Sequence, residues 1–305
     1  MIQHEGQYCG AYLRRALLHS AGTKTSTIAA LSDGMALTAV AHGLRSACLI
    51  SSFPTTFGNV IALQTTIMEA LSSVDQLIIL VHRESEQTFV VNVKAFEDRQ
   101  RAQADHPSAL FYYLNGSRPS GTIDVPTGLH HLLKLLQKSF RRTHASSTSD
   151  SNVPLLCTNA VNTSPIASRK IGVALAGWLL EYSVIYCFEE EKNLLDANAF
   201  DVHELTPSDF ALTDAFESAI HLSESTQHLR GLSLLLVTVE LSPEGKDKFP
   251  LYQFTLPEAI VIAERKNDII EEINTRMAPR LKDTSLQQCS VLISWKNAIS
   301  GPIAL

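Results

Sequence analysis

The sequence predicts an α/β protein: one domain with a single mixed, largely parallel central sheet that helices flank on both faces. Short apolar runs alternate with longer segments of helical periodicity. The short runs are apolar at consecutive positions, which is typical of strands covered on both faces. The chain has 305 residues, of which 45% are hydrophobic, so it is long enough to bury a sizeable core.

The first half of the chain contains a strand, a helix and a second strand in succession. Residues 46–53 (SACLISSF) and 76–81 (QLIILV) are apolar runs, and residues 57–71 have helical spacing. This order predicts parallel strands joined by a right-handed crossover. The turn HRESEQ then leads to TFVVNV, which we expect to fold back as an antiparallel neighbour. Other expected elements are helices at 13–19, 28–44 and 129–140 and a strand at 109–114.

The second half repeats this mixture of elements. Its last helix is predicted to follow a capping box, Thr255-Leu-Pro-Glu258, and to stop at Pro279. Another helix should open at Thr206, which is followed by proline. The remaining expected elements are helices at 166–180 and 259–277 and strands at 184–188, 232–241, 251–256 and 289–295.

Residues 143–165 interrupt every periodicity. This stretch, THASSTSDSNVPLLCTNAVNTSP, holds nine Ser or Thr residues and two prolines. Such a composition is typical of disordered segments, so the sequence predicts a disordered Ser/Thr-rich insertion in an otherwise single domain spanning residues 1–305.

Residues 171–188 (IGVALAGWLLEYSVIYCF) have one charge, Glu181. Eighteen helical residues would span about 27 Å, close to a hydrocarbon core of about 30 Å. Glu181-Tyr-Ser, however, interrupts the run, and the β-branched and aromatic residues after it favour a strand. We therefore expect a buried helix followed by a central strand, and no membrane span.

Charge and cysteine usage bear on partners and location. The net charge of −6 argues against nucleic-acid binding, and the short basic clusters at Arg99, Arg101 and 138–142 are expected to be solvated helix ends. Five cysteines, with no C-x-x-C pair, are typical of a reducing compartment. With no evident signal peptide, the sequence predicts a cytoplasmic protein.

The first candidate site is the loop after the first strand. In open α/β sheets ligands bind beyond the carboxyl ends of parallel strands, where a helix N-terminus attracts anions. Hydroxyl and amide side chains there would complete a ligand cradle. The alternative is that they only cap the next helix and its turn. The candidates are Ser51, Ser52, Thr55, Thr56 and Asn59.

Three further candidates lie at strand ends. His82, a possible general base, ends the second strand, and Asn115 and Arg118 lie in a loop where Arg118 would clamp a carboxylate or phosphate. Surface and turn roles are the alternatives. Asp201 and His203 share a strand face, but two ligands are too few for a metal, so neither metal nor cofactor is predicted.

Several segments together resemble a known family. These are GLRSACLISSF, QLIILVHRESEQTFVVN, GWLLEYSVIYCFEEEKNLL and LLLVTVELSPEGKDKFPLYQFTLPE, of which the blocks GWLLEYSVIYCF and LYQFTLPE are the most specific. They resemble a eukaryotic domain of unknown function, represented in vertebrates by an open reading frame on chromosome one. The resemblance implies a soluble, intracellular, single folding unit. It brings no established activity, cofactor or catalytic residue.

Two classes of function remain open. The sequence favours a non-enzymatic protein that acts through protein partners, with the Ser/Thr-rich insertion as a docking segment switched by phosphorylation. The alternative is a hydrolase-like enzyme that binds a small molecule or nucleotide, with its site between the loops at residues 51–59 and 115–121. The first is preferred because no acid, base and nucleophile converge in the sequence, and mainstream nucleotide and hydrolase motifs are absent from it.

Overall fold

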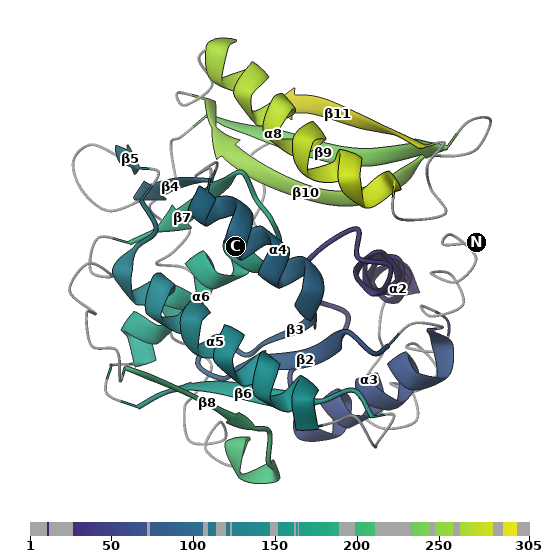
Figure 1. The fold of residues 1–305 in the computed structure, drawn as a ribbon, viewed down its shortest axis with the longest axis vertical. Coiled ribbons are helices and arrows are strands. Elements are labelled where there is room, and N and C mark those ends of the chain that lie inside the picture. The colour runs from purple at the N-terminus through teal and green to yellow at the C-terminus, as the bar shows by residue number, and fades with distance from the viewer. Residues whose placement is uncertain are drawn as a thin grey trace.

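The fold was analysed in a computed structural model of the chain (Figure 1). The structure describes residues 11, 27–71, 74–105, 109–113, 120–122, 124–146, 152–161, 163, 165–188, 199–210, 233–243, 248–258, 263–282 and 289–297. The helix expected at residues 13–19 lies outside this part of the chain.

The described residues form six α-helices, one short 3₁₀ helix and eleven strands. The helices are α2 (Thr27–Ala41), α3 (Phe57–Ala70), α4 (Val93–Asp105), α5 (Thr127–Ser146), α6 (Pro165–Leu179), η2 (Pro207–Asp209) and α8 (Ala263–Lys282). The strands are β1 (Ala47–Ile50), β2 (Leu77–His82), β3 (Gln87–Asn92), β4 (Leu110–Tyr113), β5 (Ser120–Thr122), β6 (Leu155–Ala160), β7 (Val184–Cys187), β8 (Phe200–Glu204), β9 (Leu234–Pro243), β10 (Phe249–Pro257) and β11 (Cys289–Asn297).

The main sheet has five strands in the order β1-β3-β2-β6-β8. Only the β2–β6 pairing in this sheet is parallel; the β1–β3, β2–β3 and β6–β8 pairings are antiparallel. The prediction of a single, largely parallel sheet is therefore wrong, because continuous apolar runs report burial on both faces but not strand direction.

The strand–helix–strand unit of β1, α3 and β2 shows why the sheet is mostly antiparallel rather than parallel as predicted. β1 and β2 run in the same direction, as predicted, but β3 lies between them and pairs antiparallel with both. β3 returns from β2 through residues 83–86, where Glu86 has a positive φ of 52°. The antiparallel return after HRESEQ is thus confirmed, whereas direct pairing of the first two strands is not.

The stretch predicted as a disordered insertion contains regular structure. Residues 155–160 form β6 in the middle of the main sheet, and α5 extends to Ser146. The prediction is wrong for these residues, since the apolar run at Leu155 and Leu156 fits a buried strand despite its Ser/Thr-rich surroundings.

Two three-stranded sheets complete the fold, in the orders β5-β4-β7 and β10-β9-β11. The hairpin of β9 and β10 is confirmed. The proposed capping box is wrong, because Thr255 belongs to β10 while α8 starts at Ala263. Pro279 does not stop α8, which continues to Lys282; its missing amide removes one bond in the last turns only.

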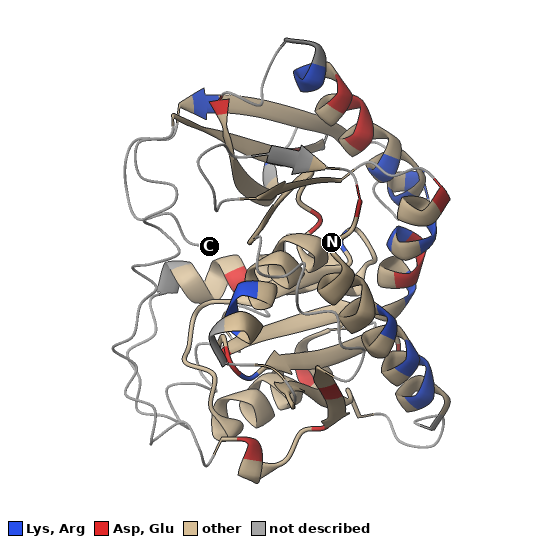
Figure 2. Cartoon of the chain, turned by 90° about the vertical axis from the view of Figure 1, so that its left-hand side faces the viewer, with Lys and Arg blue, Asp and Glu red and all other residues tan. Residues whose placement is uncertain are grey.

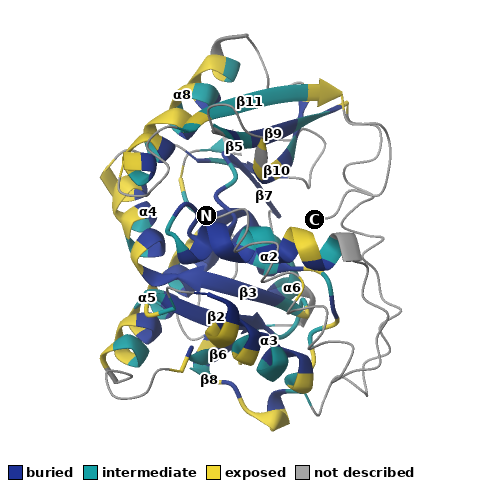
Figure 3. Ribbon diagram, turned by 90° about the vertical axis from the view of Figure 1, so that its right-hand side faces the viewer, coloured by how far each residue is buried: buried dark blue, intermediate teal, exposed yellow. Residues whose placement is uncertain are grey.

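Helices cover both faces of the main sheet, and its central strands β2 and β3 are buried (Figure 3). Along β2, Ile78 and Leu80 pack in one cluster with α4, α5 and α6, while Ile79 and Val81 pack in a second cluster with α2 and α3. A third cluster joins α8 to β9, β10 and β11, and it includes Tyr186 on β7 of the β5-β4-β7 sheet. The expectation of helices on both faces is thereby confirmed.

The apolar stretch 171–188 is a buried helix followed by a strand, as expected. α6 ends at Leu179, a turn follows, and β7 starts at Val184. Among the described helices, none combines the length and the apolar character that crossing a membrane would need.

Candidate functional site

The loop after β1 is fixed by one acidic side chain. Asp33, on α2, accepts hydrogen bonds from the backbone amides of Ser51 (3.0 Å) and Ser52 (2.8 Å) and from the Ser51 hydroxyl (3.2 Å). The backbone amides that we expected to bind an anionic ligand therefore already bind the Asp33 carboxylate.

The other candidates of this loop also bond within the protein. Thr55 donates to the backbone oxygen of Glu86 (2.6 Å), which joins the loop to the β2–β3 turn. Thr56 caps α3 by accepting from the amide of Asn59, whose side chain donates to the Pro54 oxygen (2.8 Å). These residues therefore hold the loop in place, in agreement with the capping alternative.

His82 lies at the same edge of the sheet but is completely buried. Its Nδ1 is 2.8 Å from the Ser85 hydroxyl, and α6 covers the ring so closely that a Cβ on Gly172 would lie 3.1 Å from Cε1. Burial lowers the pKa of His82, and Glu84 opposes this only in part. Because the imidazole has no exposed surface, a substrate cannot reach it, and this burial does not suit a general base. Asn115 and Arg118 lie outside the described residues.

A different part of the molecule carries the most unusual chemistry. A cleft of about 530 Å³ lies between α4 and α8. Arg99, Arg276 and Arg280 line it together with exposed acidic residues such as Asp268 and Glu271. Acidic and basic residues follow one another along these helices (Figure 2).

Glu181 is the buried carboxylate that pairs with two of the arginines lining this cleft. Its carboxylate, which has no exposed surface, receives both terminal nitrogens of Arg280, at 2.7 and 2.8 Å, and the amide of Ser46 at 3.1 Å. Arg276 Nε is 3.8 Å away, an ion-pair distance that is too long for a hydrogen bond. Burial would raise the pKa of Glu181, but Arg280 and Arg276 outweigh it and hold the pKa well below the ordinary range.

The backbone of Glu181 is unusual as well. Its φ is +62°, in the left-handed region where the residue after a helix is usually glycine. A non-glycine residue there costs of order 1 kcal/mol or more and persists when its surroundings hold it in place. The bidentate pair with Arg280 supplies that restraint.

A second carboxylate neutralises the other arginine of α8. Glu272 accepts from Arg276 (2.5 Å) and from the Ser183 hydroxyl (2.5 Å). Arg276 also donates to the Tyr252 hydroxyl at 2.7 Å. A further buried guanidinium, that of Arg45, lies over the same tyrosine ring and donates to a backbone oxygen.

Arg99 is the cation of the cleft that has no ion-pair partner among the described residues. Its side chain packs over the Trp178 ring at 4.7 Å, the residue is 7% exposed, and its buried terminal nitrogen Nη1 has no hydrogen-bond partner there. Burial lowers its pKa to about 10, with partial compensation from Glu181, so it remains charged at neutral pH. Of the three guanidiniums that line the cleft, those of Arg276 and Arg280 bond to Glu272 and Glu181, and that of Arg99 bonds to neither carboxylate.

Comparison with known protein families identifies the group to which the chain belongs. The family model of a domain of unknown function, DUF4504, matches residues 15–295. The chain belongs to the DUF4504 family. This confirms the resemblance to a domain of unknown function, while the vertebrate chromosome-one attribution stays a prediction. No curated protein and no solved structure matches the chain.

In this DUF4504 protein, sequence reasoning missed the cleft for an identifiable reason. The prediction that Arg99 and Arg101 form a solvated helix end is wrong for Arg99, because it lies on the buried face of α4 with Phe96 and Gln103. That helical spacing was the available signal. For Glu181, the signal was a single charge in an apolar run.

Proposed function

We propose that this DUF4504 protein binds a small molecule carrying an oxyanion, a carboxylate or a phosphate, in the cleft between α4 and α8. The proposal rests on Arg99, a buried guanidinium with a surplus charge at the floor of a cleft. Removing an unpaired charge from water is costly, whereas a guanidinium fork matches two oxygens of a carboxylate or phosphate. An oxyanion would supply the missing counter-charge.

The size and rim of the cleft narrow the ligand further. Its volume of about 530 Å³ is in the range typical of small-molecule sites. Exposed Asp268 and Glu271 on α8 stand at the rim and would repel a polyanion. The ligand expected here has one anionic group for Arg99 and donor groups, such as hydroxyls or amines, for the rim.

The arrangement favours binding over catalysis at this cleft. Glu181, Glu272, Arg276 and Arg280 already bond to one another, and the group left over, Arg99, positions an anion rather than transferring a proton. The partner hypothesis loses support because part of its docking segment is β6. The proposed cytoplasmic location rests on the cysteine usage of the sequence, five cysteines without a C-x-x-C pair.

Thermal unfolding in the presence of oxyanions tests this function. Phosphate and glycolate, a carboxylate with one hydroxyl group, are titrated separately at constant ionic strength, so that screening of surface charges does not change. Either anion should raise the Tm of the wild-type protein and leave that of Arg99→Met unaffected. The matched control, Lys94→Met, removes an exposed cation from the same helix and should respond like the wild type. An equal rise in Arg99→Met, or no rise in the wild type, would contradict the proposal.

A further inference from the structure

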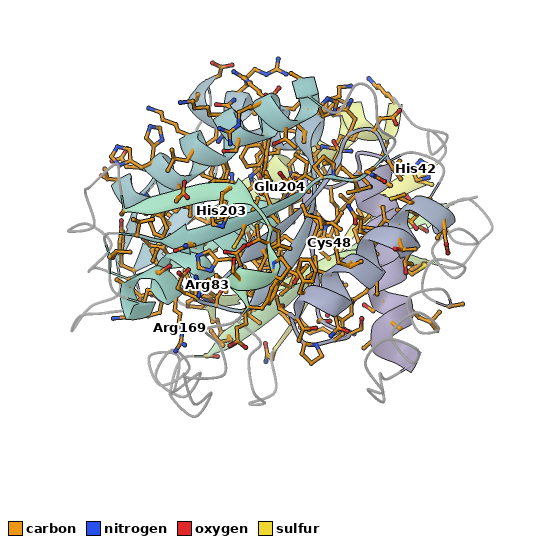
Figure 4. All side chains as sticks on the ribbon, turned by 90° about the horizontal axis from the view of Figure 1, so that it is seen from below. His42, Cys48, Arg83, Arg169, His203 and Glu204 are labelled. Carbon is orange, nitrogen blue, oxygen red and sulfur yellow. The ribbon has the colours of Figure 1, made fainter. Side chains whose placement is uncertain are left out.

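A second cluster of chemically active side chains lies at the other end of the molecule, around β8 (Figures 1 and 4). Cys157 on β6 is directly opposite His203 on the edge strand β8, so both side chains lie on the same face of the sheet. The chain then turns through η2, which places Asp209 beside the histidine. The thiol, an imidazole nitrogen and a carboxylate oxygen all lie within 4.8 Å of one another.

From this geometry we propose that Cys157, His203 and Asp209 bind a divalent transition-metal ion, with Zn²⁺ the best match to the donor set. Thiolate, imidazole and carboxylate are the three ligand types that zinc uses in proteins, at bond lengths of roughly 2.0 to 2.3 Å. Tetrahedral ligands at those lengths lie roughly 3 to 4 Å apart, so the three side chains need only small movements.

The neighbouring residues orient both oxygen and nitrogen ligands. Asp209 Oδ2 is held by the amide (2.7 Å) and hydroxyl (2.9 Å) of Thr206, which leaves Oδ1 directed at His203 Nε2 at 3.0 Å. A cation between these two atoms would replace that hydrogen bond by two coordinate bonds.

The second ring nitrogen of His203, Nδ1, lies close to the carboxylate of Asp201. His203 Nδ1 has no aligned hydrogen bond, although Asp201 Oδ2 lies 3.2 Å away. Histidines that bind metal through one nitrogen usually donate from the other to a carboxylate. Coordination at Nε2 would keep the proton on Nδ1, facing Asp201, and would release the Cys157 thiol proton to solvent.

The alternative role for such a trio is a cysteine nucleophile, and the surroundings oppose it. A nucleophilic cysteine needs a lowered pKa. Burial, together with Asp209 and Glu84, raises the pKa of Cys157 to about 12, and Arg83 offsets this only partly. The carboxylates of Asp201 and Asp209, one beside each nitrogen of His203, favour a cation at this place.

Three protein ligands leave a fourth position for water or a substrate. His203 is 31% exposed and Asp201 is 59% exposed, so the position is reached from solvent. This inference is independent of the oxyanion cleft, because none of these residues lines it.

Titration of metal-free protein with Co²⁺, a spectroscopic substitute for Zn²⁺, tests the site. The wild type should take up one equivalent with a thiolate-to-cobalt charge-transfer band and strong tetrahedral visible bands. Cys157→Ala and His203→Ala should lose both. Two controls should retain them: Cys48→Ala, another buried thiol of the same core cluster, and His130→Ala, an exposed histidine.

A graded variant keeps the test decisive if Cys157→Ala does not fold. Asp201→Asn changes an exposed residue and should weaken the affinity for Co²⁺ about 10- to 100-fold, as loss of an orienting carboxylate does. The proposal is overturned if the wild type shows no stoichiometric uptake with a thiolate band, if the band persists in a folded Cys157→Ala, or if Asp201→Asn binds as tightly as wild type.

Discussion

The loop at residues 51–59 and the cleft between α4 and α8 are both rich in polar groups. They differ in whether a buried charge remains without an ion-pair partner. In the loop, Asp33 satisfies the serine amides and the threonines bond to neighbouring backbone. In the cleft, the pairing of Glu181 and Glu272 with two arginines leaves Arg99 without a counter-ion among the described residues. Polar composition therefore indicates a binding site less well than an unmatched buried charge does.

The largest expected change in the free energy of unfolding comes from removing the negative charge of Glu181. Glu181→Gln should reduce the free energy of unfolding by about 3 to 5 kcal/mol, because it leaves Arg280 and Arg276 buried without their carboxylate. Urea unfolding followed by circular dichroism measures the change.

Glu271→Gln provides the control for Glu181→Gln. Glu271 is an exposed acid on α8, and its loss should change stability by no more than about 0.5 kcal/mol. If the two variants were equally stable, Glu181 would not be the stabilising partner that the geometry indicates.

The loop gives a smaller effect of the same sign. Asp33→Ala leaves the amides of Ser51 and Ser52 without their acceptor and should cost about 1 to 3 kcal/mol in the free energy of unfolding. Ser51→Ala removes only the hydroxyl bond, on an exposed residue, and should cost less than Asp33→Ala in the same urea experiment. The opposite ranking would mean that the loop is not held by the carboxylate.

The buried His82 is expected to make the free energy of unfolding depend on pH. Because burial holds its pKa below the unfolded value of 6.5, the unfolded chain takes up the proton first as pH falls. Its contribution to stability is therefore constant above that value and falls by at most about 1.4 kcal/mol per pH unit below it. Urea midpoints between about pH 7.5 and pH 5.5 should fall less steeply in His82→Gln than in the wild type. Parallel slopes would show that the pKa of His82 is the same in the folded and unfolded chain, contrary to its burial.

The sequence predicted the elements better than their arrangement. Helices α3 and α6 and strands β2 and β7 follow from local periodicity and from the Glu181-Tyr-Ser interruption, which do not depend on distant residues. Strand direction depends on which strands pair, and β3 enters between β1 and β2 without any local signal. β6 was missed because the Ser and Thr residues around it outweighed a short apolar run.

The sites were less predictable because their residues are distant in sequence. Glu181 and Arg280 are separated by 99 residues, and Cys157 meets His203 only through the β6–β8 register. A sequence can show that a residue is out of place, as Glu181 is in an apolar run. It does not show the partner, since that follows from how the sheets pack.

Among the substitutions of buried groups, the smallest stability change, and the sharpest contrast with Glu181, is expected at Arg99. Arg99→Met keeps the apolar stem over Trp178 and removes the surplus charge. Replacing an unpaired buried ion by an apolar side chain of similar shape is neutral or stabilising, so the free energy of unfolding should stay the same or rise by up to about 1 kcal/mol, while the response to phosphate or glycolate is lost. Urea unfolding and the anion titration measure the two effects on one protein. A site kept for binding gives this combination, because its charge costs stability and contributes function. A loss of several kcal/mol, as for Glu181→Gln, would instead make Arg99 a structural member of the charge cluster.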